Sequence, residues 1–360
     1  MKFVKGKFLS EQYYKRHIQK LIAKAYPRLN YSAGLIGPGS DVLGFDTIRS
    51  TDHDWGPRLM IFLKEKDFYQ KQKIKDYLKQ HLPKTFMGYP THFRGTVDGD
   101  VKVMAKLKKG ETFNPGIAIN TVEKFFAEYM GIQNTNNIKI TKWLLLSEHK
   151  LRTIKEGRLF RDDLSMNILK AKFDYYPNDI WLYLMAAEWQ KIAQEEPFMA
   201  RCGEVGDELG SRLIAYKLVR SIMNLVFQME RQYIPYSKWF GTAFNRLNKA
   251  KIIKPILDKV LVARKWQSRE AQLSKAYKTL GKFHNELQIT EFVSPELSYF
   301  FNRPYQIIDA DRYVEALREK IKSPDILNIK ANIGSVNQIT QTVDVLEQND
   351  LIQQMKYLFK

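Results

Sequence analysis

Hydrophobic residues in the first third of the chain follow helical spacing in two places, and strand-like spacing between and after these two places. An amphipathic stretch stopped by Pro27 predicts a helix over 10–30, and a second helix is expected over Asp67–Leu82. The continuous apolar run Leu59–Leu63 is typical of a buried strand. Further strands are expected near 41–46, 52–63, 91–97, 101–107 and 116–120. These elements predict a small mixed sheet.

From Thr121 onward the hydrophobic period becomes helical. Apolar residues recur at intervals of three and four over 181–189 and again over 214–229, so both segments present an apolar stripe to a core. Further helices are expected at 249–264, 267–288 and 310–321. The fold class predicted is therefore α+β, with a small mixed-sheet domain at 1–130 followed by a helical bundle domain at 131–360 that would hold a substrate or partner.

Two aspartates stand just before the apolar strand. If Asp52 and Asp54 lay in an extended strand, their side chains would project from the same face. Two adjacent carboxylates could then share one hard cation, and Mg²⁺ is usually held by one or two carboxylates together with substrate phosphates. The alternative is an exposed strand face, where solvated carboxylates need no partner.

A glycine-rich turn precedes these aspartates. In Gly34–Ser40, backbone N–H groups can approach phosphate oxygens because glycine lacks a Cβ, and Ser40 adds a hydroxyl. The alternative is a turn whose serine merely caps a helix. Together, Gly39 with Ser40 and Asp52 with Asp54 favour a site for a nucleoside triphosphate and its metal ion. The Asp41–Asp46 stretch is expected to shape the turn.

Several short motifs accompany the turn and the aspartates. They are Gly39–Asp46 (GSDVLGFD), Asp52–Arg58 (DHDWGPR), Tyr176–Trp181 (YPNDIW), Arg201–Arg212 (RCGEVGDELGSR), Pro235–Phe244 (PYSKWFGTAF), Arg303–Pro304 and Gly334–Gln338 (GSVNQ). With them the chain resembles, over nearly its whole length, a bacterial family of nucleotidyltransferase-like proteins in which a domain of unknown function follows a polymerase-beta-like nucleotidyltransferase fold. The resemblance implies transfer of a nucleoside monophosphate from an NTP to an acceptor hydroxyl, with release of pyrophosphate.

The resemblance also implies roles for individual residues. Asp52 and Asp54 would bind Mg²⁺ or Mn²⁺, Gly39 and Ser40 the triphosphate, and Arg58 or a Lys/Arg of the helical bundle would offset developing negative charge. Positions expected near the acceptor are Arg201, Asp207, Ser211, Arg212, Tyr236 and Lys238.

The wider superfamily supplies a third carboxylate from a later strand, but the candidate strand 116–120 contains none. Asp98 and Asp100 could substitute, although Asp-Gly is equally a hairpin signal. A second source is the helical domain, where Glu204 and Glu208 are expected to share one helix face with Asp207 and Ser211. Acids at a helix start also suit the macrodipole, so that face has a purely structural alternative.

Charge widens the choice of partners. The formal net charge is +19, and 244–288 alone contains eleven Lys/Arg against three acids. Such a surface attracts polyanions, and its basic residues alternate with the aromatic residues of 239–266, a mix compatible with RNA. A solvated helix surface would look the same. An NTP, an RNA and a small-molecule acceptor are therefore the candidate partners.

The remaining composition bounds the class of protein. One cysteine, Cys202, excludes an intrachain disulfide framework, and the scattered histidines lack zinc-ligand spacing. No signal peptide or membrane span is evident, so a cytoplasmic protein is expected. No Gly-x-Gly-x-x-Gly follows a strand in a dinucleotide-binding arrangement. The competing classes are a non-catalytic nucleotide- or RNA-binding protein that retains the fold and an assembly protein with a helical partner surface.

Overall fold

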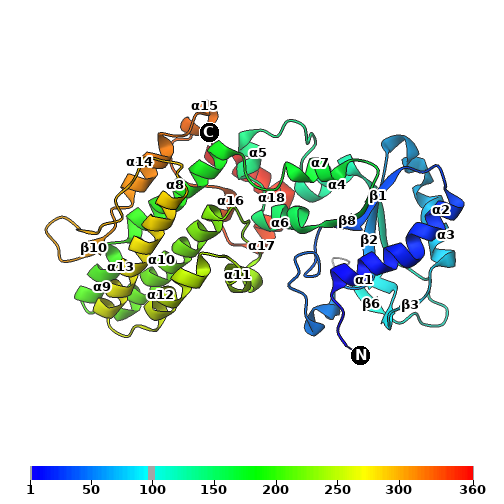
Figure 1. Cartoon of the computed structure of the whole chain (residues 1–360), viewed down its shortest axis with the longest axis horizontal. Helices are drawn as coiled ribbons and strands as arrows, with labels where there is room; N and C mark the ends of the chain where they lie inside the picture. The colour runs from blue at the N-terminus through cyan, green and yellow to red at the C-terminus, as the bar shows by residue number, and fades with distance from the viewer. Residues whose placement is uncertain (1, 96–101, 360) are drawn as a thin grey trace. The chain divides into compact units, whose positions relative to one another are not determined.

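The computed structural model describes residues 2–95 and 102–359, which form two compact units. The first unit contains residues 1–138 and 150–174, and the second contains 139–149 and 175–360. This division differs from the predicted boundary at 130/131, because the chain returns to the first unit to add one more strand, β8 (Arg158–Asp162), to its sheet. Figure 1 shows the elements of each unit in order along the chain.

The first unit is organised by a four-stranded mixed sheet with strand order β7-β2-β1-β8. Strand β1 (Tyr31–Leu35) pairs antiparallel with β2 (Arg58–Leu63) and with β8, whereas β2 runs parallel to β7 (Gly116–Thr121). The small mixed sheet predicted from the sequence is therefore confirmed, although β1 and β8 were not among the expected strands.

Strand β2 is covered on both faces, although Arg58 and Met60 are only half-buried. Leu59, Ile61 and Leu63 point into a hydrophobic cluster, while Phe62 packs at a ring distance of 5.4 Å against Phe125 of α4 (Val122–Met130). The continuous apolar run from which this strand was predicted reflects that double coverage.

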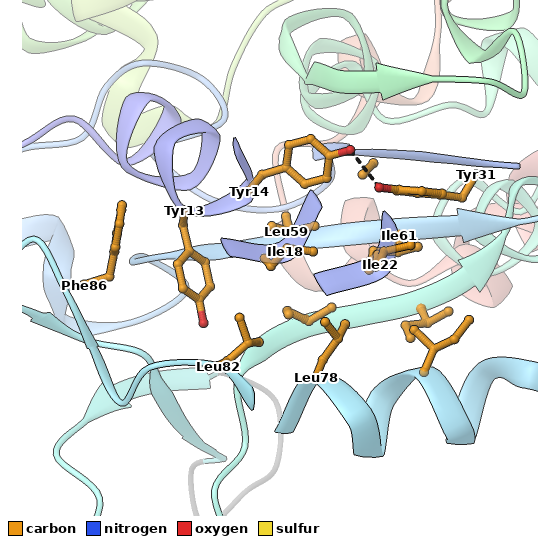
Figure 2. Packing of buried hydrophobic residues seen from close by; sticks show 14 of the residues in the cluster. Tyr13, Tyr14, Ile18, Ile22, Tyr31, Leu59, Ile61, Leu78, Leu82 and Phe86 are labelled. Atoms are coloured by element: carbon orange, nitrogen blue, oxygen red, sulfur yellow. Dashed lines mark hydrogen bonds between the residues drawn. The ribbon is translucent and has the colours of Figure 1, made fainter. Parts of the chain in front are cut away.

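The cluster on one side of the sheet is built from two helical segments. The first runs as α1 (Gly6–Tyr13), a π-helical turn and α2 (Gln19–Ala25), and the second is α3 (Lys71–His81). Figure 2 shows the side chains of these helices gathered with those of the strands, and the hydroxyls of Tyr14 and Tyr31 hydrogen-bonded at 3.0 Å.

Short strands complete the first unit. Strand β5 (His92–Gly95) pairs antiparallel with β6 (Lys102–Ala105), and two two-residue strands, β3 (Thr85–Phe86) and β4 (Tyr89–Pro90), pair with each other. Asp98 and Asp100 lie outside the described residues. The strand expected at 41–46 is wrong: this stretch is a series of turns.

The second unit is helical, as predicted. Its largest helices are α8 (Asn178–Glu195), α10 (Glu208–Met229) and α13 (Trp266–Glu286), which Figure 1 labels within one bundle. The other helices are α5 (Ile140–Leu144), α9 (Phe198–Glu204), α11 (Ser237–Phe244), α12 (Ala250–Val262), α14 (Asp311–Arg318), α15 (Pro324–Leu327), α16 (Val336–Ile339), α17 (Val343–Glu347) and α18 (Asn349–Gln354). Helix α6 (Glu148–Glu156) begins in the second unit and ends in the first, and α7 (Met166–Ala171) belongs to the first. In the second unit, β9 (Ser298–Tyr299) pairs with β10 (Gln306–Ile307). The predicted fold class, α+β with a small mixed sheet followed by a helical part, is confirmed.

A buried histidine lies in the core of the bundle. His284 of α13 contacts the rings of Trp189 and Tyr313, which stack on each other with centroids 4.2 Å apart. Its Nε2 lies 3.1 Å from the hydroxyl of Thr290. Burial lowers the pKa of His284 from 6.5 to about 4, because the core disfavours the charged imidazole.

This pKa predicts acid destabilisation of the bundle. Between pH 6.5 and 4 the unfolded chain binds a proton on His284 that the folded chain does not. Stability is therefore full above 6.5 and falls as the pH drops, by up to about 3 kcal/mol. In His284→Gln, which cannot titrate, the free energy of unfolding measured with urea should fall less between neutral pH and about pH 4.5. Equal falls in both proteins would contradict the prediction.

Candidate functional site

The two candidate motifs of the first unit lie at the same edge of the sheet. Strand β1 ends at Leu35 and β2 begins at Arg58, and the antiparallel register sets Gly34 opposite Met60. The turn that follows β1 and the loop that precedes β2 therefore leave the sheet side by side.

Gly39 is where the two segments touch. It has a φ of +133°, a backbone conformation that favours glycine. A Cβ at this position would collide with the Arg58 guanidinium and the Asp41 carboxylate, and would lie 3.1 Å from the backbone oxygen of Asp54. Only glycine allows the turn to approach the aspartate loop this closely.

Arg58 ties the turn to the start of β2. Its Nη2 lies 2.6 Å from Oδ1 of Asp41 and its Nε 3.2 Å from Oδ2, while Nη2 also donates to the Pro38 carbonyl at 2.7 Å. Asp41 is completely buried. Burial alone would lower the pKa of the Arg58 guanidinium, but the Asp41 carboxylate and the nearby Asp54 outweigh it and raise that pKa. Arg58, expected to face phosphate, thus has a buried structural partner.

Asp46 and Trp55 hold the outer part of the site. Trp55 is fully buried, its ring stacks on Phe3 at 5.5 Å, and its Nε1 donates to Oδ2 of Asp46 at 3.0 Å. The same carboxylate oxygen accepts the backbone N–H of Gly6 at 2.8 Å. Together with the Asp41 contacts, this confirms that the Asp41–Asp46 stretch shapes the turn.

Asp52 and Asp54 do not lie on a strand, so the predicted strand over 52–63 is wrong in its first part. Asp52 ends a 3₁₀ turn (Ile48–Asp52), and its side chain is 66% exposed, with Oδ1 3.0 Å from Nδ1 of His53. Asp54 has a φ of +42° and exchanges two hydrogen bonds with the backbone of Lys102: its N–H donates at 2.7 Å and its Oδ1 accepts at 3.2 Å. The strand begins only at Arg58, because buried Trp55 and the following Gly56, with a φ of +135°, turn the chain first.

The donor set of this loop suits a hard cation. Exposed Asp52 and half-buried Asp54 supply oxygen ligands of the type that Mg²⁺ prefers, to be completed by phosphate oxygens and water, but they do not share the strand face from which the pair was predicted. Within 2–95 and 102–359, the structure brings no three His, Cys, Asp or Glu side chains together as a metal cluster. The fit therefore rests on Asp52 and Asp54.

The acidic face expected in the second unit is divided between two helices. Helix α9 ends at Glu204, Gly206 has a φ of +83°, and α10 begins at Glu208 after Asp207, whose carboxylate accepts the N–H of Gly210 at 2.7 Å as an N-cap. The prediction that these acids share a single helix face is wrong. Gly206 follows the end of α9, and Asp207 caps the N-terminus of α10.

The acids of this region have structural partners. Arg269, only 1% exposed, donates to the Ser211 hydroxyl at 2.5 Å and to Oε2 of Glu208 at 3.1 Å. Desolvation opposes the charge on Glu208, but the hydrogen bonds from Arg269 and the Trp266 N–H, together with the charges of Arg269 and Arg212, outweigh it and lower the pKa of Glu208. A carboxylate with a lowered pKa is a weaker general base. Glu204 accepts the hydroxyl of Tyr305.

The expected acceptor residues are spread over the second unit. Arg201 lies exposed in the last turn of α9, and Arg212 donates to the Arg264 carbonyl at 3.3 Å. Lys238 lies over the ring of Trp239 at 4.5 Å. Tyr236 alone among the expected acceptor residues lines the cavity described below.

Some lysines of the basic region 244–288 form ion pairs within the protein. Lys249 pairs with Glu286, and Lys254 pairs with Asp258 at 2.6 Å. Among the aromatic residues expected to stack on bases, Phe244 is 1% exposed and therefore cannot reach a base.

Comparison with known proteins gives two matches. Residues 143–240 match a family model described as a domain of unknown function (DUF4037). The crystal structure of a nucleotidyltransferase-like protein from Exiguobacterium sibiricum 255-15 matches with 11% sequence identity and a TM-score of 0.32, covering 77% of this chain and 79% of that one. At that TM-score the likeness carries no argument about the site. No curated protein matches the chain at a significant level.

No helix in the described part of the chain has both the length and the apolar character needed to cross a bilayer.

Removing Arg58 should destabilise the first unit strongly. Arg58→Met leaves the buried Asp41 carboxylate without its partner, and we expect the free energy of unfolding to fall by about 3–5 kcal/mol. Asp41→Asn combined with Arg58→Met should recover part of the loss, since no buried charge remains. Urea denaturation measures both.

Arg158→Met provides the matched control. Arg158 pairs with Glu11 at 3.1 Å, but its own side chain is 54% exposed. An exposed pair contributes about 0–1 kcal/mol. Similar losses in Arg58→Met and Arg158→Met would show that the Asp41 pair is energetically an ordinary surface pair.

Proposed function

We propose that the first unit catalyses metal-dependent nucleotidyl transfer, in which a nucleoside monophosphate moves from an NTP to an acceptor hydroxyl. The observation that carries the proposal is the close approach of the Gly39 turn to the backbone of Asp54. It supports a common site in which a turn suited to phosphate lies beside carboxylates suited to a cation.

The proposed roles follow from this arrangement. Gly39 and Ser40 bind the triphosphate, and Asp52 and Asp54 would hold Mg²⁺ or Mn²⁺, which when bound supplies charge neutralisation for the phosphate oxygens. Arg58 holds the turn in position through Asp41 and Pro38, and the Asp41 carboxylate matches most of its charge.

The transfer itself exchanges one bond for another. The acceptor hydroxyl oxygen attacks the α-phosphorus, the bond from that phosphorus to the bridging oxygen breaks, and pyrophosphate leaves. The hydroxyl proton passes to a base, for which Asp98, Asp100, Glu204, Glu208 and solvent are the candidates. The lowered pKa of Glu208 weakens it as a base. The acceptor belongs to a small molecule or an RNA, and the cytoplasm is the proposed compartment.

A second function is favoured by the strand next to β2. Strand β7 lies parallel to β2 and sets Asn120 opposite Phe62, and its sequence GIAINT contains no carboxylate. A chain that kept the turn and the first two aspartates without a third acid would bind NTP or RNA without transferring a nucleotide.

Pyrophosphate release distinguishes the two functions. We would measure release from each of four labelled NTPs with Mg²⁺ or Mn²⁺, with and without total RNA or a metabolite extract, in wild type and Asp52→Asn/Asp54→Asn. The double variant should lose at least about 100-fold in rate, because both candidate metal ligands lose their charge. Its melting temperature should barely change, since Asn tolerates the left-handed conformation of Asp54 and can still accept from Lys102.

Asp76→Asn is the matched control, because Asp76 is a half-exposed acid on α3 of the same unit. It should release pyrophosphate at the wild-type rate. Undiminished turnover in Asp52→Asn/Asp54→Asn would refute the assignment of the transferase site to these aspartates, and NTP binding without any release would favour the non-catalytic function.

A further inference from the structure

The second unit contains a cavity of about 310 Å³. Its wall is formed by α8, α10, the segment before α11 and residues 337–347, so the cavity lies entirely within this unit. The volume is at the lower end of the range of about 300–1,000 Å³ typical of small-molecule sites. Its walls at 147–149, 188–224 and 234–237 fall within the segment matched by the family model.

Most charges of the wall are satisfied within it. Glu188 is fully buried, and its carboxylate accepts from Gln338 Nε2 at 2.7 Å and from Asn224 Nδ2 at 3.1 Å. Lys191 donates to the Gln338 carbonyl at 2.8 Å. Lys217 likewise pairs with Glu195 at 2.8 Å. The wall also includes Glu148, which accepts the Ile234 N–H at 2.7 Å, and Glu347. These contacts fix the shape of the wall, and its four carboxylates nearly balance its three cationic side chains.

Arg220 is the exception. Its guanidinium lies over the ring of Phe240 at 4.8 Å, and among the described residues it has no carboxylate partner and its Nε no hydrogen-bond acceptor. One helical turn later, Oδ1 of Asn224 has no donor within the described structure, and the hydroxyl of Ser147, another residue of the wall, has no hydrogen-bond partner there. Each unpaired buried polar atom costs about 1–3 kcal/mol. A wall that keeps three of them is suited to a polar ligand.

The unpaired groups define the chemistry of that ligand. A guanidinium with an unpaired Nε and no carboxylate partner matches one phosphoryl or carboxylate group, and the free amide oxygen of Asn224 requires a donor such as a hydroxyl. Gln194, Gln341 and Thr340 add further hydrogen-bonding groups, and the rings of Tyr216 and Tyr236 offer apolar faces for a sugar ring. We infer that the cavity binds a small hydroxylated anion of the sugar-phosphate or sugar-acid type.

This inference rests on the second unit alone and does not depend on the proposed nucleotidyl transfer. Consequently Asp52→Asn/Asp54→Asn should bind the anionic sugar as wild type does, whether or not transfer occurs.

Calorimetric titration of the full chain tests the inference. The probes are glucose 6-phosphate and glucuronate, which distinguish a phosphoryl from a carboxylate anion, with glucose and inorganic phosphate as partial ligands. At least one anionic sugar should bind with a Kd of about 1 mM or tighter. Glucose and phosphate should each bind at least about tenfold more weakly, because each lacks half of the recognised chemistry.

Two variants connect binding to the cavity. Arg220→Gln should weaken anionic-sugar binding at least about tenfold, since a hydrogen bond to a charged group is lost. Ser237→Trp places a bulky ring at an exposed position of the wall and should block entry without disturbing the core. Arg28→Gln, the same chemical change at an exposed residue of the first unit, should bind as wild type.

The outcomes are decisive even if Arg220→Gln folds poorly, because Ser237→Trp alters only an exposed residue. Loss of binding in Ser237→Trp, with binding retained in Arg28→Gln, supports the site. Absence of binding up to about 10 mM of either anionic sugar overturns it. Phosphate bound as tightly as glucose 6-phosphate, or binding unchanged in Ser237→Trp and in a folded Arg220→Gln, also overturns it.

Discussion

The arrangement of the first unit depends on one buried ion pair, between Asp41 and Arg58. Burying Asp41 is costly unless its charge is matched, and Arg58 at the first position of β2 supplies the match with two hydrogen bonds. The pair fixes the distance between the turn after β1 and the start of β2. Gly39 then follows as a requirement, because any side chain there would occupy the space of the guanidinium.

Elements whose burial follows a local sequence period could be predicted, and elements placed by long-range contacts could not. Helices α3, α12 and α13 were predicted within a few residues, because their apolar period reports one buried face. Strands β1 and β8 carry no such period. In β1, Gly34 packs directly against the backbone of β8 at Arg158 and Leu159, and its place in a strand is decided by that long-range contact rather than by local pattern.

The candidate site shows the same division. Residue type identified Gly39 and the two aspartates, and the structure brings Gly39 against Asp54. The sequence could not reveal that Asp52 and Asp54 precede the strand, because their geometry is imposed by the burial of Trp55 against Phe3 and Asp46. Two expected functional residues, Glu208 and Ser211, instead hold buried Arg269, whose position 58 residues beyond Ser211 no local spacing encodes.

The cavity of the second unit was also hidden, although one signal was present in α10. Arg220 and Asn224 are polar residues within α10, and their neighbours Leu218, Val219 and Ile222 are buried. Polar residues one turn apart in such a helix must be paired by the fold or by something it binds. Asn224 is half paired, through Glu188, and Arg220 has only an aromatic ring. The second unit therefore has a feature that packing alone does not account for, and its chemistry is independent of the aspartates of the first unit.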